Sequence, residues 1–347
     1  MTCDRIVEIE TLRILGQDYG KIRDNTTLSG TYGSIVKYMN SSQTETYAIK
    51  SFKEQREEDP YFEEIIILLL LKMEKKYPKY LIPAYPVMLK DCYFNIMHFK
   101  KETLIDLKTT PTLLDKNKTA IFNDVLNGLI SLTSLSYMYG DLKAANTLFT
   151  LKTDDRVKIY LADLGGIAPF GKEHENNMRD KIDDFLNSTE IPVLQKGKIR
   201  GKYENDTEKM VYNITSSPFT YPTKTYYPKV NVKSEFEQYL CHFFHQIVVM
   251  YFYLNNYDTR IYEHNQLTNN IYRQAEFIKK TPIHDQLHPF YFIQTNSELI
   301  RGYMRLATEK EVISAIIRDL KKMKIKPGDH KTIIVNKNPF SLFGSNI

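Results

Sequence analysis

The sequence predicts an α+β protein of two lobes, a small antiparallel β-sheet lobe with one main helix and then a larger, mostly helical lobe. Alternating apolar patterns over the first third of the chain indicate short strands. Apolar repeats of helical period dominate after residue 103. The chain has 347 residues, enough for each lobe to bury its own core. We expect a β-rich lobe over residues 1–99, a helical lobe over 100–330 and a tail over 331–347.

The cysteines and the apolar runs indicate the compartment. Cys3, Cys92 and Cys241 are far apart and lack CxxC spacing, so neither a disulfide framework nor a zinc site is indicated. The longest apolar run, residues 65–71, is too short to span a bilayer, and the first residues contain no signal-peptide core. We therefore expect an intracellular, cytoplasmic protein with no membrane span.

The charge restricts the partners. A net charge of +5 is small for this length and permits an anionic partner such as a nucleotide or an acidic peptide. Lysine and tyrosine are plentiful, but they are scattered and form neither a basic stripe nor a stacking motif. No nucleic-acid partner is therefore expected.

The first strands surround a glycine turn. Residues 28–52 predict a strand, a glycine turn, a second strand, a polar loop and a third strand. Gly30 and Gly33 stand in GxxG spacing, which allows the backbone to approach a phosphate closely. Taken alone, this spacing also fits an ordinary hairpin turn.

A lysine on the third strand and the helix after it form a possible pair. Lys50 lies on the alternating strand 46–52, and Asp-Pro at residues 59–60 opens a helix of about four turns. Glu63 or Glu64 in this helix can reach Lys50 across the sheet. The alternative is that these acids only complement the positive end of the helix dipole.

The chain then crosses from strands to helices. Residues 80–90 and 92–99 predict two further strands, residues 100–103 a crossover, and residues 113–137 a long amphipathic helix. One face of that helix is apolar: Ile121, Val125, Leu126, Leu129, Leu132 and Leu135.

The last half of the chain contains one unusually apolar helix. Residues 171–217 are polar and predict a long loop with one short helix, whereas residues 236–254 predict a helix apolar on nearly all sides, as at the centre of a lobe. His242 and His245 on it favour packed core positions over metal ligands, because no nearby carboxylate or cysteine completes a site. Residues 260–325 predict further helices.

The stretch between the two large helices carries the chemistry. Two short apolar runs flank a polar turn at residues 152–156, which predicts a hairpin. Asp141 and Asn146 precede it and Asp163 follows it, so the hairpin should bring them together. Two carboxylates and an amide, with Lys143 between them, suit a hard cation and a phosphate. Each residue alone also fits an Asx turn, but the whole set in this order favours a site.

These motifs, in this order, resemble the eukaryotic-type protein kinase domain over about residues 20–325. The family's Val-Ala-Ile-Lys strand is similar to Tyr-Ala-Ile-Lys at 47–50, and its Glu-Ile-x-Ile-Leu helix to residues 64–68. Its loop His-Arg-Asp-Leu-Lys-x-x-Asn resembles Tyr-Gly-Asp-Leu-Lys-Ala-Ala-Asn at 139–146, and its Asp-Phe-Gly resembles Asp-Leu-Gly at 163–165. The resemblance implies a bilobal protein-kinase-like fold.

The resemblance also implies roles for the catalytic residues. Lys50 would hold the α- and β-phosphates of ATP, and Glu64 would orient Lys50. Asp141 would accept the proton of the substrate hydroxyl, and Lys143 would offset charge on the transferred phosphoryl group.

The resemblance further implies a cofactor site. Asn146 and Asp163 would bind Mg²⁺, for which Mn²⁺ is a possible substitute. The base would lie between Ile35, Ala48 and Leu148, with Met97 behind it and the backbone of His98 and Phe99 at its edge. The expected nucleotide-binding set is Gly30, Gly33, Ile35, Ala48, Lys50, Met97, His98, Phe99 and Leu148.

Some positions depart from the family pattern. Leu28 replaces the first glycine of the phosphate loop, and Tyr139 replaces the usual histidine. Gly140 replaces the arginine that would bind a phosphate on the activation segment, so control by that route is not expected. Thr223 stands where the family has a glutamate, which leaves the substrate-docking region open.

The resulting expectation is an ATP- and magnesium-dependent kinase that phosphorylates serine or threonine hydroxyls of a protein substrate. Lys143 resembles the serine/threonine branch of the family more than the tyrosine branch. Two alternatives stay open: a pseudokinase or scaffold that binds nucleotide or partner proteins, and a kinase-fold enzyme acting on a small molecule.

Overall fold

The protein is described here from a computed structural model. The described residues are 10–14, 16–23, 28–29, 33–52, 68, 71, 76–89, 92–169, 243–244, 246–247, 250–251, 253–255, 303, 305–306 and 308–325.

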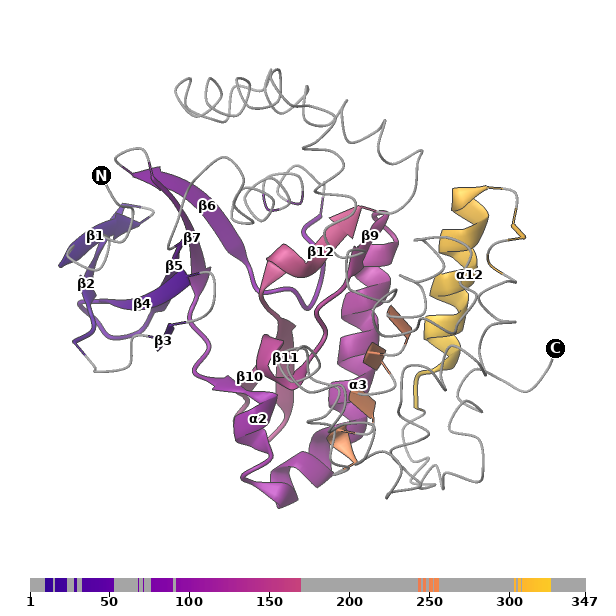
Figure 1. Ribbon diagram of the computed structural model, residues 1–347. Helices are drawn as coiled ribbons and strands as arrows, with labels where there is room; N and C mark the ends of the chain where they lie inside the picture. The colour runs from indigo at the N-terminus through magenta and orange to yellow at the C-terminus, as the bar shows by residue number, and fades with distance from the viewer. Residues whose placement is uncertain are drawn as a thin grey trace, which may run out of the picture.

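The amino-terminal lobe is an antiparallel sheet, at the left of Figure 1. Its spatial order is β1 (Thr11–Ile14), β2 (Gln17–Lys21), β4 (Gly33–Asn40), β5 (Thr46–Phe52), β7 (Cys92–His98) and β6 (Ala84–Leu89), with β3 (Leu28–Ser29) paired to β4. The central strand β5 is the most buried, and one face of the sheet packs as a small cluster of its own. The predicted antiparallel sheet lobe is thus confirmed.

The β1–β2 hairpin was not predicted. These strands are mostly exposed and only Tyr19 on β2 is buried, and the alternation of Leu12 and Ile14 in β1 extends over just four residues, too few to predict a strand. Gly16 in the connecting turn has a φ of +84°, a left-handed conformation that glycine adopts without steric cost.

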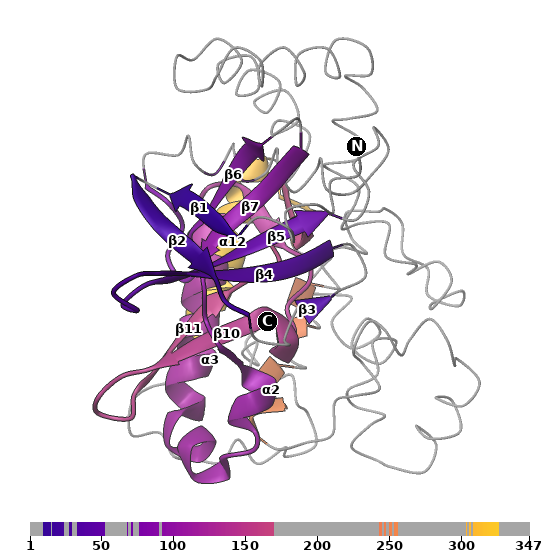
Figure 2. The ribbon, with the colours of Figure 1, turned by 90° about the vertical axis from the view of Figure 1, so that its left-hand side faces the viewer.

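The second lobe is built on two helices and a hairpin (Figures 1 and 2). Helix α2 (Leu104–Leu107) is capped by Thr103 and leads to the long helix α3 (Pro111–Thr133). The strands β10 (Thr147–Leu151) and β11 (Val157–Leu161) form the predicted hairpin, in which Thr147 pairs with Leu161. Residues 100–103, predicted as a crossover, also contain the short strand β8 (Glu102–Thr103), which pairs with β10.

The long helix ends earlier than predicted. The expected apolar face is correct, since five of its six members are fully buried and Leu135 is partly buried. However, α3 stops at Thr133 rather than at residue 137, because Ser136 turns with a left-handed φ of 64°. The residues beyond form strand β9 (Tyr137–Tyr139), which pairs with β12 (Ile167–Pro169).

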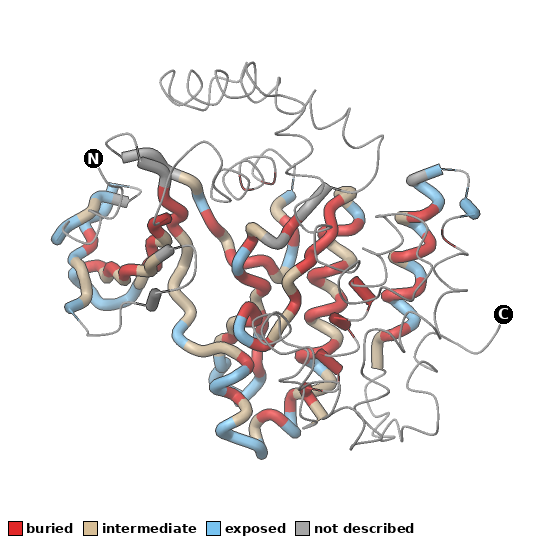
Figure 3. The backbone as a smooth tube through the Cα atoms, viewed as in Figure 1, coloured by how far each residue is buried: buried red, intermediate tan, exposed pale blue. Residues whose placement is uncertain are grey.

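The core continues into the last part of the chain. The described residues between 243 and 254 are helical and buried, as predicted for the apolar helix, and the Tyr253 hydroxyl donates to Leu104 O at 3.2 Å. Helix α12 (Glu309–Lys322) packs beside α3, and its buried residues join the same core (Figure 3). Asn123 on α3 fixes the chain after α12 by exchanging two hydrogen bonds with the backbone of Ile325.

Several predictions fall outside the described residues. They concern the loop at 171–217, the pair His242 and His245, and the tail at 331–347. The helix predicted from residue 59 also lies outside them, except for Leu68 and Leu71, which are helical. Among the helices of the described part of the chain, none is long and apolar enough to cross a bilayer.

A buried amide holds the β10–β11 turn against α3, and its removal should destabilise the protein. Asn117 donates to Asp155 O at 3.0 Å and accepts from Val157 N at 3.1 Å. We expect Asn117→Ala to lower the free energy of unfolding by about 1–3 kcal/mol, because both backbone groups lose their partner. Urea denaturation measures the change.

The control for this substitution is Lys118→Ala, which removes an exposed ion pair with Asp115 on the same helix. Its expected cost is at most about 0.5 kcal/mol. Equal costs for the two variants would contradict the structural role of Asn117.

Candidate active site

The hairpin brings the ends of its two strands together beside the site. Beyond β11, Ala162 N donates to Asn146 O at 2.8 Å, so the ladder continues one step past the strands. Asp163 is the next residue, and Asn146 closes a short 3-10 turn over Ala144–Asn146. The two predicted metal ligands therefore emerge from adjacent backbone positions.

The carboxylate of Asp141 is held by two neighbours. Asn146 Nδ2 donates to Asp141 Oδ2 at 2.7 Å and to its carbonyl oxygen at 3.1 Å. Lys143 Nζ lies 2.9 Å from the same Oδ2. Both side-chain contacts fall on Oδ2, and no described residue donates to Oδ1. Asp141 thus presents one oxygen that can accept a proton.

Asp163 connects the two lobes. Its Oδ1 lies 3.0 Å from Lys50 Nζ on β5, and the Lys50 side chain is only 15% exposed whereas that of Asp163 is 45% exposed. Partial burial opposes ionisation of Asp163, but the charge and hydrogen bond of Lys50, together with the charge of Lys143, hold its pKa below the usual range. The carboxylate is therefore ionised at neutral pH.

The backbone of Asp163 is strained. Its φ of 55° and ψ of 68° are left-handed, which is uncommon for a residue with a side chain. Such conformations cost on the order of 1–3 kcal/mol and concentrate at functional sites.

Tyr139 positions the residue before Asp163. Its ring is buried, and its hydroxyl donates to the carbonyl oxygen of Ala162. The sequence marks Tyr139 only as a replacement for histidine, and the contact it makes was not predicted.

Gln246 was missed entirely. Its Oε1 accepts a hydrogen bond from Leu142 N, next to Asp141. The only signal in the sequence is an amide in the apolar part of a helix that also carries Gln238, His242 and His245.

The strands of the sheet place four predicted nucleotide residues on one face. Ala48 and Lys50 are two residues apart on β5 and therefore point to the same side. Ile35 on β4 pairs with Lys50, and Met97 on β7 pairs with Ala48, and directly opposed residues share a face. Leu148 on β10 is half-buried and packs against the main core.

The segment between the lobes has one backbone donor already in use. Phe99 N donates to Thr46 O at 2.9 Å, so this N–H continues the sheet. The His98 ring lies against Tyr47, with ring centroids 4.7 Å apart. Burial and the charge of Lys100 lower the pKa of His98, against an opposing effect of Glu45, so the ring is neutral at pH 7.

The structure tests little of what was predicted for three residues of the phosphate site. Gly33 opens β4 opposite Phe52, whereas Gly30 and Glu64 lie outside the described residues. The glycine cover over the phosphates and the Lys50–Glu64 pair therefore stay predictions.

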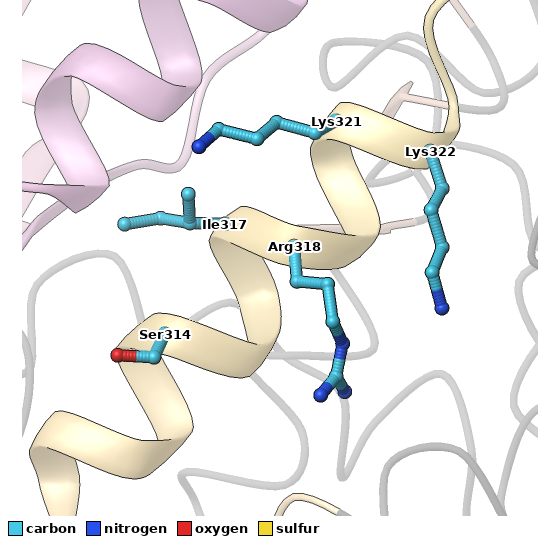
Figure 4. Close-up of a pocket in the computed structure, with 5 residues that line it drawn as sticks. All are labelled: Ser314, Ile317, Arg318, Lys321 and Lys322. Carbon is cyan, nitrogen blue, oxygen red and sulfur yellow. The ribbon is translucent and has the colours of Figure 1, made fainter.

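A separate groove of about 590 Å³ lies on α12 (Figure 4). Its described lining residues are far in the sequence from Asp141, Asn146 and Asp163. Its described lining is Ser314, Ile317, Arg318, Lys321 and Lys322. None of these five described residues carries a carboxylate or a side-chain amide that could hold a cation, so we do not assign nucleotide chemistry to the groove.

Comparison with known proteins agrees with this geometry. Residues 26–188 match the family model described as the protein kinase domain. A search of curated proteins found no match. The matched segment contains β4, β5, the hairpin, Asp141, Asn146 and Asp163, whereas Gln246 lies outside it. Residues 26–188 are thus similar to the protein kinase domain, and this match supports the expected relation to the protein kinase superfamily.

Proposed function

We propose that the protein is an ATP- and magnesium-dependent kinase that transfers a phosphoryl group to serine or threonine hydroxyls of a protein substrate. The proposal rests chiefly on one arrangement. The hairpin holds Asp141 and Asn146 beside Asp163, and Lys50 reaches Asp163 from the other lobe. Phosphoryl transfer depends mainly on positioning and charge neutralisation, and this set of residues offers both.

The donor set suits a magnesium ion. Asn146 uses its Nδ2 for Asp141, which leaves its amide Oδ1 as an oxygen ligand beside the ionised Asp163. Mg²⁺, when bound with ATP, would supply neutralisation of the phosphate charge. Asn146 and Asp163 would hold it, and Lys50 would hold the phosphates.

The remaining residues handle the proton and the acceptor. Asp141 would orient the hydroxyl and take its proton on Oδ1, while Asn146 and Lys143 fix Oδ2. Lys143 would also offset the negative charge of the phosphoryl group during transfer. The preference for serine or threonine comes from the family resemblance at Lys143.

Removal of the base should abolish transfer while leaving nucleotide binding intact. We expect Asp141→Asn to lower kcat by about 10²–10⁴-fold, because the amide cannot accept the proton. Transfer of labelled phosphate from magnesium-ATP to a generic basic protein measures kcat, and calorimetry measures ATP affinity. Asp115→Asn, an exposed aspartate on α3, is the matched control and should behave as wild type.

This assay also separates the alternative functions. Magnesium-ATP binding without transfer in the wild type would indicate a pseudokinase. Transfer to a small molecule but to no peptide would indicate a small-molecule kinase. Equal transfer by wild type and Asp141→Asn would exclude Asp141 as the base.

Removal of the proposed metal ligand Asp163 should make ATP affinity less dependent on magnesium. In the wild type, we expect Mg²⁺ to tighten ATP binding, measured by calorimetry with and without EDTA. In Asp163→Asn this magnesium-dependent gain should fall about tenfold or more, because a charged ligand is lost. An unchanged gain would show that the metal binds elsewhere.

A further inference from the structure

One peptide group beside the proposed base is held from both sides. The peptide between Asp141 and Leu142 is planar, so its carbonyl and its N–H point in opposite directions. The carbonyl accepts from Asn146 Nδ2 at 3.1 Å, and the N–H donates to Gln246 Oε1. Asn146 is five residues away, whereas Gln246 comes from a helix 104 residues further along the chain.

Gln246 is an unusual residue for its surroundings. It is 8% exposed, and its helical neighbours Phe243, Phe244 and Ile247 are fully buried. Its oxygen must face Leu142, because an N–H cannot donate to another N–H. Its Nε2 is then buried with no hydrogen-bond partner among the described residues. Burial of half an unpaired amide is unfavourable, so stability alone gives a poor account of a glutamine here.

We infer that Gln246 is a positioning residue for Asp141, an inference that rests on the proposed function. With both ends of the peptide fixed, rotation about the backbone of Asp141 is restricted, and the Asp141 carboxylate keeps its orientation. Asn146 alone would hold only the carbonyl side. Loss of the Gln246 oxygen should let the peptide plane tilt. The Asp141 carboxylate should then move away from the substrate hydroxyl whose proton it would accept.

The test separates catalysis from nucleotide binding. Gln246→Leu keeps similar volume but offers Leu142 N no acceptor, and we expect kcat to fall about tenfold or more. KM for magnesium-ATP should stay within about twofold, since Lys50 and Asp163 are untouched. Gln246→Glu keeps an oxygen at the acceptor position in either protonation state and should restore most of kcat.

A matched control tests whether the effect is merely structural. Asn123 Oδ1 also accepts a backbone N–H, that of Ile325 at 2.9 Å, and among the described residues its side chain forms hydrogen bonds with Ile325 alone. Asn123→Leu should lower Tm and leave kcat unchanged. If Gln246→Leu does not fold, Gln246→Asn replaces it, because its shorter side chain withdraws the acceptor from Leu142.

The outcomes distinguish this inference from the proposed function. Wild-type kcat in folded Gln246→Leu, or an equal kcat loss in Gln246→Leu and Gln246→Glu, would overturn the positioning role. If the wild type itself transfers nothing, the proposed function fails. Amide hydrogen exchange at Leu142 then decides the inference: faster exchange in Gln246→Leu than in Gln246→Glu supports it, and equal exchange overturns it.

Discussion

The arrangement depends on how closely the chain packs around Leu161, the last residue of β11. Leu161 pairs with Thr147 across the hairpin, and its backbone also bonds to the segment before β6, through Leu161 N to Tyr80 O at 2.6 Å and Ile82 N to Leu161 O at 2.9 Å. A Cβ on Gly128 of α3 would lie 3.1 Å from Leu161 Cδ1, so only glycine fits there without displacement. Three elements thus meet at one residue, two positions before Asp163.

This junction explains why a local sequence pattern could predict much of the site. A hairpin needs only its own residues to bring Asn146 near Asp163, so the spacing of Asp141, Asn146 and Asp163 carried the information. The contact between Lys50 and Asp163 spans 113 residues and was not predicted, since the family resemblance paired Lys50 with Glu64 and the phosphates.

Other features had no local signal. The true end of α3 depends on the left-handed turn at Ser136 and on the pairing of β9 with β12, which no helical period reveals. Gln246 depends on a single long-range contact, and one polar residue does not alter the periodicity of an apolar helix. Helix periodicity therefore identified the element but not the residue in it that reaches the site.

The departures from the family pattern differ in how much they change the site. Tyr139 differs from histidine in shape, yet its hydroxyl still bonds to the backbone beside Asp163, so this change does not favour a loss of catalysis. Gly140 has no side chain to offer a phosphate. The hydrogen bond and the ion pair of the Asp141 carboxylate are still in place beside it.

The charges around the site favour joint binding of nucleotide and metal. Lys50 forms an ion pair with Asp163, and Lys143 forms one with Asp141. ATP alone would draw Lys50 toward its phosphates and leave Asp163 facing added negative charge. If the proposed function holds, a divalent cation held by Asp163 would offset that repulsion. The Lys50–Asp163 pair would then make favourable nucleotide binding depend on the metal.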